Sequence, residues 1–355
     1  MLRRNGAVNR MTGEMVKFRS KKKVIPPGRI VVISDTHFGD RAQLLDKSPL
    51  VDRLMEVLSS RGPISELILL GDILDLWVKT RVPALRDARY FVESISRLEN
   101  VGKILYVPGN HDHDMFMNAF RLEVDVNIMQ GDLSIPRFMP ARQYDETLIS
   151  GVADPGSKTE FQMAYPFVVR EVNGTDVVFT HGHHLDFFDP DFGFARTFWL
   201  SKRIIRKRRK TATLHDIEMA NLPFCGAMSM APWVPELVEG GIRFYRVINF
   251  FAKMLRSRTL RRSILRDTLI KENYDEIAGL LPLLGRPNPG CFVFGHTHRP
   301  GMGKLPDTHV TVANSGAWVS NDEDVPAMTW LELEHDVKLY RLADDDAELM
   351  YSQSI

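Results

Sequence analysis

Five short stretches of the sequence combine carboxylate, imidazole and amide side chains, the groups that bind metal ions or move protons. In chain order they read SDTHFGD (34–40), LLGDILDLW (69–77), PGNHDHD (108–114), FTHGHH (179–184) and FGHTHRP (294–300). Oxygen and nitrogen ligands without thiolate suit first-row divalent ions such as Mn²⁺, Fe²⁺ or Zn²⁺. A carboxylate such as Asp72 has two oxygens and could bridge two ions about 3.5–4 Å apart. The residue types therefore predict metal chemistry.

The spacing within two of these stretches supports convergence on one point. Asp35 and His37 are two residues apart, as are His296 and His298. If the extended geometry of a preceding strand persists, alternate side chains lie on the same side of the backbone. Each pair would then face a single site.

Each stretch begins where a segment with strand character ends. RIVVIS (29–34), ELILL (66–70), KILYVPG (103–109) and CFVFG (291–295) are typical of buried strands, and FVVREVNGTDVVFTH (167–181) predicts a hairpin around Asn173-Gly174. Helices are predicted over 49–61 and 84–100, so strands and helices alternate as in an α/β layered fold. Loops at the carboxyl ends of such strands meet at one edge, so we expect the five stretches to lie together.

Three more strands near the C-terminus complete the predicted architecture. They are HVTVANS (309–315), AMTWLEL (327–333) and DVKLYRL (336–342). This number of strands favours an α/β protein with two facing mixed β-sheets flanked by helices. The predicted divisions are a basic N-terminal tail (1–28), a core in two parts (29–186 and 290–343), an inserted helical cap (187–289) and a C-terminal tail (344–355).

The charge is unevenly distributed along the chain. The formal net charge is +1, yet residues 187–290 carry 18 Lys and Arg against 10 Asp and Glu. This basic, aromatic cap would pack on the core, hold an acyl chain, contact an anionic membrane surface or bind nucleic acid. Two cysteines are too few for a disulfide framework and indicate a reducing compartment. The sequence predicts neither a secretory signal nor a membrane-spanning helix.

The ordered motifs resemble those of the calcineurin-like metallophosphoesterase superfamily. Its pattern is D-x-H, G-D-x-x-D, G-N-H-D/E, H-G and G-H-x-H, and all five elements occur in that order between about residues 30 and 320. The resemblance implies two divalent metal ions, with Mn²⁺ favoured over Fe²⁺ and Zn²⁺. It also implies a metal-bridging hydroxide that attacks a phosphoester or pyrophosphate.

The resemblance assigns roles to individual residues. One ion would be held by Asp35, His37, Asp72 and His298, and the other by Asp72, Asn110, His181 and His296. His111 would protonate the leaving oxygen as a general acid.

Neighbouring polar residues are expected to support these groups. Asp75 and Asp112 would orient histidines by accepting their second N–H. His183, His184 and Asp186 would either contact the substrate or serve as a scaffold. The remaining histidines, His113, His215, His309 and His335, are expected to be ordinary surface or core residues.

Details of the motifs favour one branch of the superfamily. GDILDLW, GNHD and FGHTHRP are similar to the bacterial branch that contains UDP-2,3-diacylglucosamine pyrophosphohydrolase, whereas protein Ser/Thr phosphatases have GNHE. The fourth motif departs from that branch, because it reads HGHH instead of HGD, and the insert is larger. The resemblance implies an enzyme that acts on a lipid-linked or other phosphorylated small molecule. From the cysteine count and the basic cap we expect it to be cytoplasmic and peripheral to the inner face of the membrane. The alternatives are a nuclease similar to the SbcD type and a non-catalytic binding module.

Overall fold

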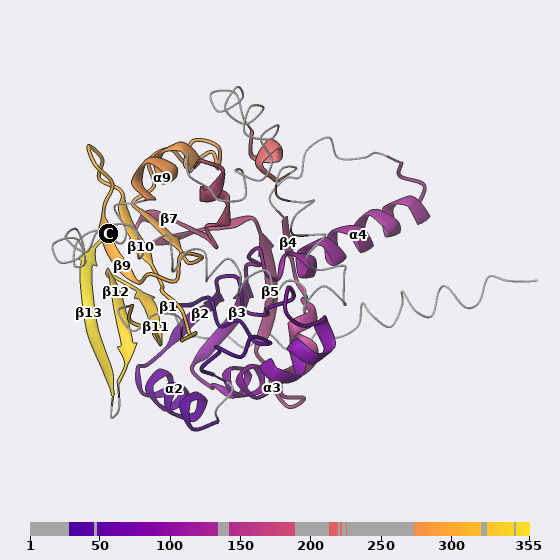
Figure 1. Ribbon diagram of the computed structural model, residues 1–355, viewed down its shortest axis with the longest axis horizontal. Helices are drawn as coiled ribbons and strands as arrows, with labels where there is room; N and C mark the ends of the chain where they lie inside the picture. Colours follow the sequence, from indigo (N-terminus) through magenta and orange to yellow (C-terminus); the bar gives the residue numbers. More distant parts are fainter. Residues whose placement is uncertain are drawn as a thin grey trace, which may run out of the picture.

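Buried strands in two facing sheets form the centre of the protein (Figure 1). The computed structural model describes residues 28–45, 48–133, 142–188, 213–218, 221, 225, 273–320, 325–343 and 346–355. Within these residues, the first sheet has eight strands in the order β13-β12-β11-β1-β2-β3-β5-β4, and the second has five in the order β6-β7-β8-β10-β9. The predicted α/β fold of two mixed sheets with flanking helices is confirmed.

The elements have the following bounds. The first sheet consists of β1 (Arg29–Ile33), β2 (Ile64–Leu69), β3 (Val101–Tyr106), β4 (Arg142–Tyr144), β5 (Glu160–Tyr165), β11 (Thr329–Leu333), β12 (Asp336–Leu342) and β13 (Ala347–Ser354). The second consists of β6 (Phe167–Val172), β7 (Thr175–Thr180), β8 (Cys291–Phe294), β9 (Gly301–Lys304) and β10 (Thr311–Asn314). The helices are α2 (Ser48–Ser60), α3 (Arg81–Arg97), α4 (His113–Met129) and α9 (Tyr274–Leu280), with 3₁₀ turns η1 (Leu148–Val152) and η2 (His183–Phe187).

The outer face of the first sheet is covered by α2 and α3 (Figure 1). Val31, Leu67 and Ile104 lie side by side across the parallel strands β1, β2 and β3. They belong to the same buried cluster as Leu54 of α2 and Phe91 of α3. Because successive strand residues point to opposite faces, this register aims one apolar row of each strand at the helices.

The alternate residues of these strands fill the space between the two sheets. Val32 and Ile68 share a buried cluster with Phe179 of β7 and Val293 of β8. The central strands are therefore buried on both faces, which explains why they read as continuous apolar runs in the sequence. On the far side of the second sheet, α9 packs through residues such as Ile277.

The local predictions agree closely with the structure. β6 and β7 form the predicted hairpin, with φ of 52° at Asn173 and 76° at Gly174, as a two-residue type I′ turn requires. The helix predicted over 49–61 is observed as α2, and the one predicted over 84–100 begins earlier, as α3. Pro83 lies in the first turn of α3, where a missing N–H costs nothing.

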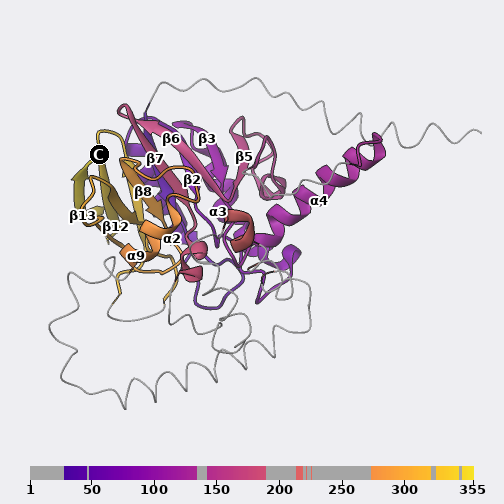
Figure 2. The same cartoon turned by 90° about the horizontal axis from the view of Figure 1, so that it is seen from above.

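Some elements were not predicted. The segment expected as a C-terminal tail contains β13, which pairs antiparallel with β12. The strands β4 and β5 and the helix α4 were also missed. The only buried residues of α4 are His113, Met115 and Phe116 in its first turn. Its remainder projects away from the sheets in both views (Figures 1 and 2). A helix that packs little of its length on the core needs no apolar stripe, and this stripe is the pattern that identifies a helix in a sequence.

Most of the predicted insert lies outside the described residues. The parts described are 187–188, 213–218, 221, 225 and 273–289, of which 214–218 and α9 are helical. The predicted N-terminal tail also lies outside, apart from residue 28. No helix among the described residues is both long and apolar enough to cross a membrane.

Candidate metal centre

The five motifs lie in loops that directly follow the carboxyl ends of strands. Asp35 and His37 follow β1, Asp72 follows β2 and Asn110 follows β3. In the second sheet, His181 follows β7, while His296 and His298 follow β8. The two sheets thus supply ligands to one region from opposite sides.

The backbone at these positions is not extended. Left-handed φ values occur at Asp35 (52°), His37 (48°), Asp72 (50°), His296 (65°) and His298 (58°). Such residues cost about 1–3 kcal/mol each and gather at functional sites. The expectation that each D-x-H or H-x-H pair continues its strand is therefore wrong. The side chains converge because tight left-handed turns follow the strands.

A first group of possible ligands consists of Asp35, His37 and His298. One ligand atom from each lies within 4.8 Å of the others. Nε2 of His37 is 3.0 Å from Nε2 of His298, which in turn is 3.2 Å from Oδ1 of Asp35. Asp72 Oδ2 lies 3.8 Å from His37 Nε2.

A second group consists of Asp72, His181 and His296, and is equally compact. His181 Nε2 is 3.1 Å from Asp72 Oδ2 and 3.2 Å from Asn110 Oδ1. Asp72 therefore lies between the two groups. The structure brings together all seven residues that the sequence suggested as metal ligands.

The donor chemistry of the site fits cations. Nδ1 of His37 donates to Asp75 Oδ2 at 3.1 Å, and Nδ1 of His181 donates to the carbonyl of Leu70 at 2.9 Å. With the outer N–H groups used in this way, the Nε2 atoms of His37 and His181 both face Oδ2 of Asp72. A cation satisfies such a ring of acceptors.

The pKa values of these histidines also indicate a site that favours positive charge. Burial lowers the pKa of His37, but its hydrogen bond to Asp75 and the charge on Asp72 outweigh burial and raise it to about 9. For His181, burial is likewise outweighed by the charge on Asp72, and the pKa rises to about 10. Positive charge is thus favoured at this point of the molecule, whether a proton or a metal ion carries it.

Glycines allow the loops to approach one another. A Cβ at Gly109 would lie 2.3 Å from Oδ1 of Asp72, and one at Gly295 would lie 2.4 Å from Oδ2 of Asp35. Real side chains do not approach so closely. The glycines of GNHD and FGHTHRP therefore leave room for the carboxylates of neighbouring loops.

His111 lies at the edge of the two groups. Its Nδ1 is 3.0 Å from Oδ1 of Asp75, its ring stacks on Trp77 with centroids 3.8 Å apart, and its backbone N–H donates to Asp72. Its ring also lies within ligand distance of His37 and Asp72. Asp75 accepts from both His37 and His111, as an orienting residue would. These contacts lower the pKa of Asp75 although burial raises it.

The other expected supporting residues have different contacts. Asp112 bonds to backbone N–H groups, at 2.6 Å from Gly109 and 2.8 Å from Ile73, and not to a histidine. Asp186 Oδ2 is 3.0 Å from Nε2 of His296, and its charge raises the pKa of His296 against the effect of burial. Asp186 thus contacts one of the seven possible ligands.

His183 and His184 belong to a separate buried cluster that includes Glu218. One ligand atom from each of the three residues lies within 4.8 Å of the others. Tyr165 and His113 also face this cluster. Sequence reasoning did not identify Tyr165 or Glu218, which belong to no motif, and it treated His113 as an ordinary residue.

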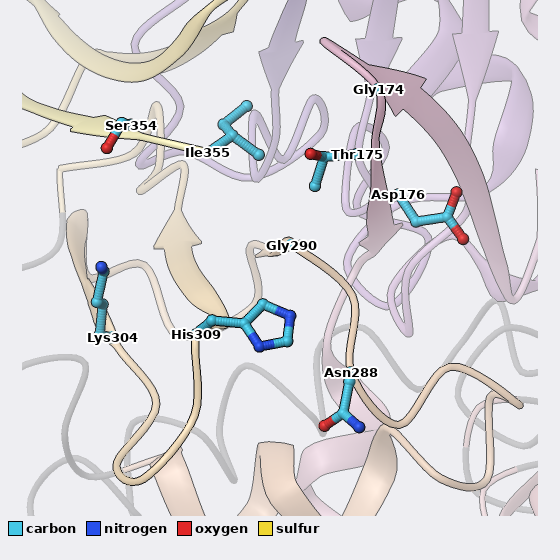
Figure 3. Close-up of a pocket in the computed structure, with 9 residues that line it drawn as sticks. All are labelled: Gly174, Thr175, Asp176, Asn288, Gly290, Lys304, His309, Ser354 and Ile355. Atoms are coloured by element: carbon cyan, nitrogen blue, oxygen red, sulfur yellow. The ribbon is translucent and has the colours of Figure 1, made fainter.

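A surface hollow of about 610 Å³ lies elsewhere (Figure 3). It is lined by Thr175 and Asp176 at the start of β7, by Lys304 at the end of β9, and by His309 before β10. This is the opposite end of the second sheet from the ligand loops. The hollow therefore does not belong to the candidate metal centre.

Comparison with protein families identifies the class to which the fold and site belong. The model of the calcineurin-like phosphoesterases matches residues 28–300, most of the chain. The protein belongs to the calcineurin-like phosphoesterase family. No curated protein matches the sequence.

Several solved structures resemble the chain at low identity. They include a dimetal phosphatase from Danio rerio (12% identity, 92% of this chain and 98% of that chain covered, TM-score 0.42). A phosphopantetheinyl hydrolase from Mycobacterium tuberculosis matches at 17% identity (81% and 89% covered, TM-score 0.32). Vps29 from Entamoeba histolytica in complex with zinc matches at 11% identity (92% and 99% covered, TM-score 0.33). These values are too low to support an argument, so the family assignment depends on the family model.

Proposed function

We propose that the protein is a hydrolase of a phosphoester or pyrophosphate bond that depends on two divalent metal ions. The main observation is the position of Asp72, whose carboxylate lies within ligand distance of both His37 and His181. Such a carboxylate suits a bridge between two ions. The first ion would be held by Asp35, His37, Asp72 and His298, and the second by Asp72, Asn110, His181 and His296.

The metal ions, with Mn²⁺ as the favoured pair, would activate water as the nucleophile and neutralise charge on the phosphoryl group. His111 would donate the proton that the leaving oxygen requires. Its Nδ1 is bonded to Asp75, so its Nε2 would be the donating atom. Stacking on Trp77 fixes the ring plane.

The distribution of exposure indicates where a substrate would enter. The side chains of His111, His296 and His298 are 19%, 18% and 25% exposed, whereas Asp72 and His181 are buried. One side of the ligand set is therefore open to solvent. A phosphoryl group entering there would meet the acid and the ligands together.

For the substrate we favour a lipid-linked nucleotide or another phosphorylated small molecule, cleaved in the cytoplasm beside the inner face of the membrane. This choice follows the similarity of GDILDLW, GNHD and FGHTHRP to the UDP-2,3-diacylglucosamine pyrophosphohydrolase branch. The basic residues between 187 and 290 would suit an anionic membrane surface.

The test is hydrolysis of UDP-2,3-diacylglucosamine by Mn²⁺-loaded protein, with release of nucleotide as the readout and Asp72→Asn as the control. Turnover that the variant loses supports both the chemistry and the substrate class. Cleavage of a nitrophenyl phosphodiester without cleavage of the lipid nucleotide keeps the chemistry and rejects this substrate. Single-stranded DNA then tests the nuclease alternative, and failure to bind metal would favour a non-catalytic module.

A further inference from the structure

The buried cluster beside the candidate metal centre has no part in the proposed reaction. It consists of His113 at the start of α4, Tyr165 at the end of β5, His183 and His184 of η2, and Glu218 of the segment 213–218. All five residues are at most 3% exposed. Five ionisable groups thus lie together, shielded from water, although they come from four separate segments.

Among the described residues, the hydrogen bonds of this cluster leave two imidazole nitrogens without a hydrogen-bond partner. The Tyr165 hydroxyl is 2.9 Å from both oxygens of Glu218 and donates to this carboxylate. The same hydroxyl is 3.3 Å from Nε2 of His183, which must therefore be the donor in that contact. The lone pair of His183 is then on Nδ1, which has no hydrogen-bond partner among the described residues.

His113 has the same deficit. Its Nε2 is also buried without a hydrogen-bond partner among the described residues. It lies 3.7 Å from Oε2 of Glu218, within ion-pair range but too far for a hydrogen bond. His184 Nε2 forms a short contact with Oε1 of the same carboxylate. Three imidazoles therefore surround one glutamate, and two of them have an unused nitrogen.

We propose that this cluster is a third metal site, which binds Zn²⁺ through His183, His184, Glu218 and His113. Imidazole nitrogens with one carboxylate form a set that zinc accepts in tetrahedral geometry. The ligand atoms of His183, His184 and Glu218 already lie within 4.8 Å of one another. An ion between them would replace the His184–Glu218 contact with two metal–ligand bonds and would satisfy the unpartnered nitrogens.

The role of this ion would be structural. Four protein ligands that are all buried leave no open coordination position, which distinguishes structural from catalytic zinc sites. The ion would tie residues 213–218 to η2 and α4. Because Asp186 belongs to η2 and bonds to His296, the third ion would also fix one side of the dinuclear centre.

Metal counting tests this proposal independently of activity. Metal-free protein would be reloaded with Zn²⁺ and the bound zinc measured by mass spectrometry. Glu218→Gln should bind one equivalent less than wild type. The control is Glu66→Gln, which removes another buried carboxylate that is ion-paired, here with Arg170 and Lys103 and far from these histidines. This variant should bind as much zinc as wild type. Equal counts in wild type and Glu218→Gln would overturn the proposal.

A crystal of wild-type protein gives a second test that needs no variant. A zinc-edge anomalous map should show a peak among His183, His184 and Glu218, and a map without this peak overturns the third site even if Glu218→Gln fails to fold. Asp72→Asn should remove zinc from the neighbouring groups and keep this peak. The proposal of a third site and the proposal of a dinuclear centre can thus be refuted independently of each other.

Discussion

Gly295 offers a direct test of whether packing holds the ligand loops in place. A Cβ at this residue would lie 2.4 Å from Oδ2 of Asp35 and 2.6 Å from Oγ of Ser34. Ordinary contacts begin at 3.4 Å, so Gly295→Ala requires both groups to shift by about 1 Å. Overpacking of this kind costs about 1–3 kcal/mol. Because Asp35 is a possible ligand, we expect weaker binding of one metal ion as well as lower stability.

Two measurements and one control check this expectation. Urea unfolding with chelator present would give the change in the free energy of unfolding, and calorimetric titration with Mn²⁺ would give stoichiometry and affinity. Gly151→Ala makes the same chemical change where no heavy atom lies within 4 Å of the added methyl. If Gly295→Ala unfolds and binds Mn²⁺ like Gly151→Ala, the close packing of the fifth loop against Asp35 has no energetic role, and the reasoning is refuted.

Three further predictions concern the chemistry. Asp72→Asn should retain the fold by circular dichroism but lose turnover by at least about 100-fold, which is more than the loss of a residue that only supports a metal ligand usually causes. Unchanged turnover would contradict a bridging role for Asp72. His111→Ala should slow alkyl phosphodiesters more than nitrophenyl ones, because poor leaving groups need the proton, and equal losses would exclude the acid role. In metal-free protein the pKa values of His37 and His181 are raised to about 9 and 10, so both hold protons at pH 7.5. Mn²⁺ must displace these protons, and its affinity should rise with pH up to that range. Calorimetry in buffers with different ionisation enthalpies would show the release, and buffer-independent heats would argue against it.

The positions of the ligands could be predicted because they depend on a simple rule of topology. Buried strands read as apolar runs, and parallel strands bring the loops at their carboxyl ends to one edge. Asp72, Asn110 and His181 each follow such a run within a few residues. Strand order therefore brings these residues to one edge, and the left-handed backbone at Asp72 completes its approach to the other ligands.

The conformation of the loops could not be predicted in the same way. The left-handed backbone at Asp35 and His298 costs energy that no local propensity supplies. It is stabilised by contacts from distant segments, such as the bond from the N–H of His296 to Asp35, 261 residues apart in the sequence. A pattern read within one motif does not contain this information.

The third cluster was missed for a related reason. Glu218 lies in a segment without a motif, and it contacts His184, which is 34 residues away in the sequence. His113 stands directly after GNHD, yet its side chain points to that cluster and not to the dinuclear groups. Neighbouring residues of one loop can therefore serve two different sites, and only the folded arrangement separates them.

The dinuclear centre is held by hydrogen bonds that need no metal. Asp112 accepts backbone N–H groups from both the second and third ligand loops, through Ile73 and Gly109, and so fixes them relative to each other. Asn314 donates to the carbonyl of Gly295 and steadies the loop that carries the last two histidines. The ligands are thus positioned by the ends of the strands before an ion arrives. Binding energy need not be used to order the loops, which is the condition for a preorganised site.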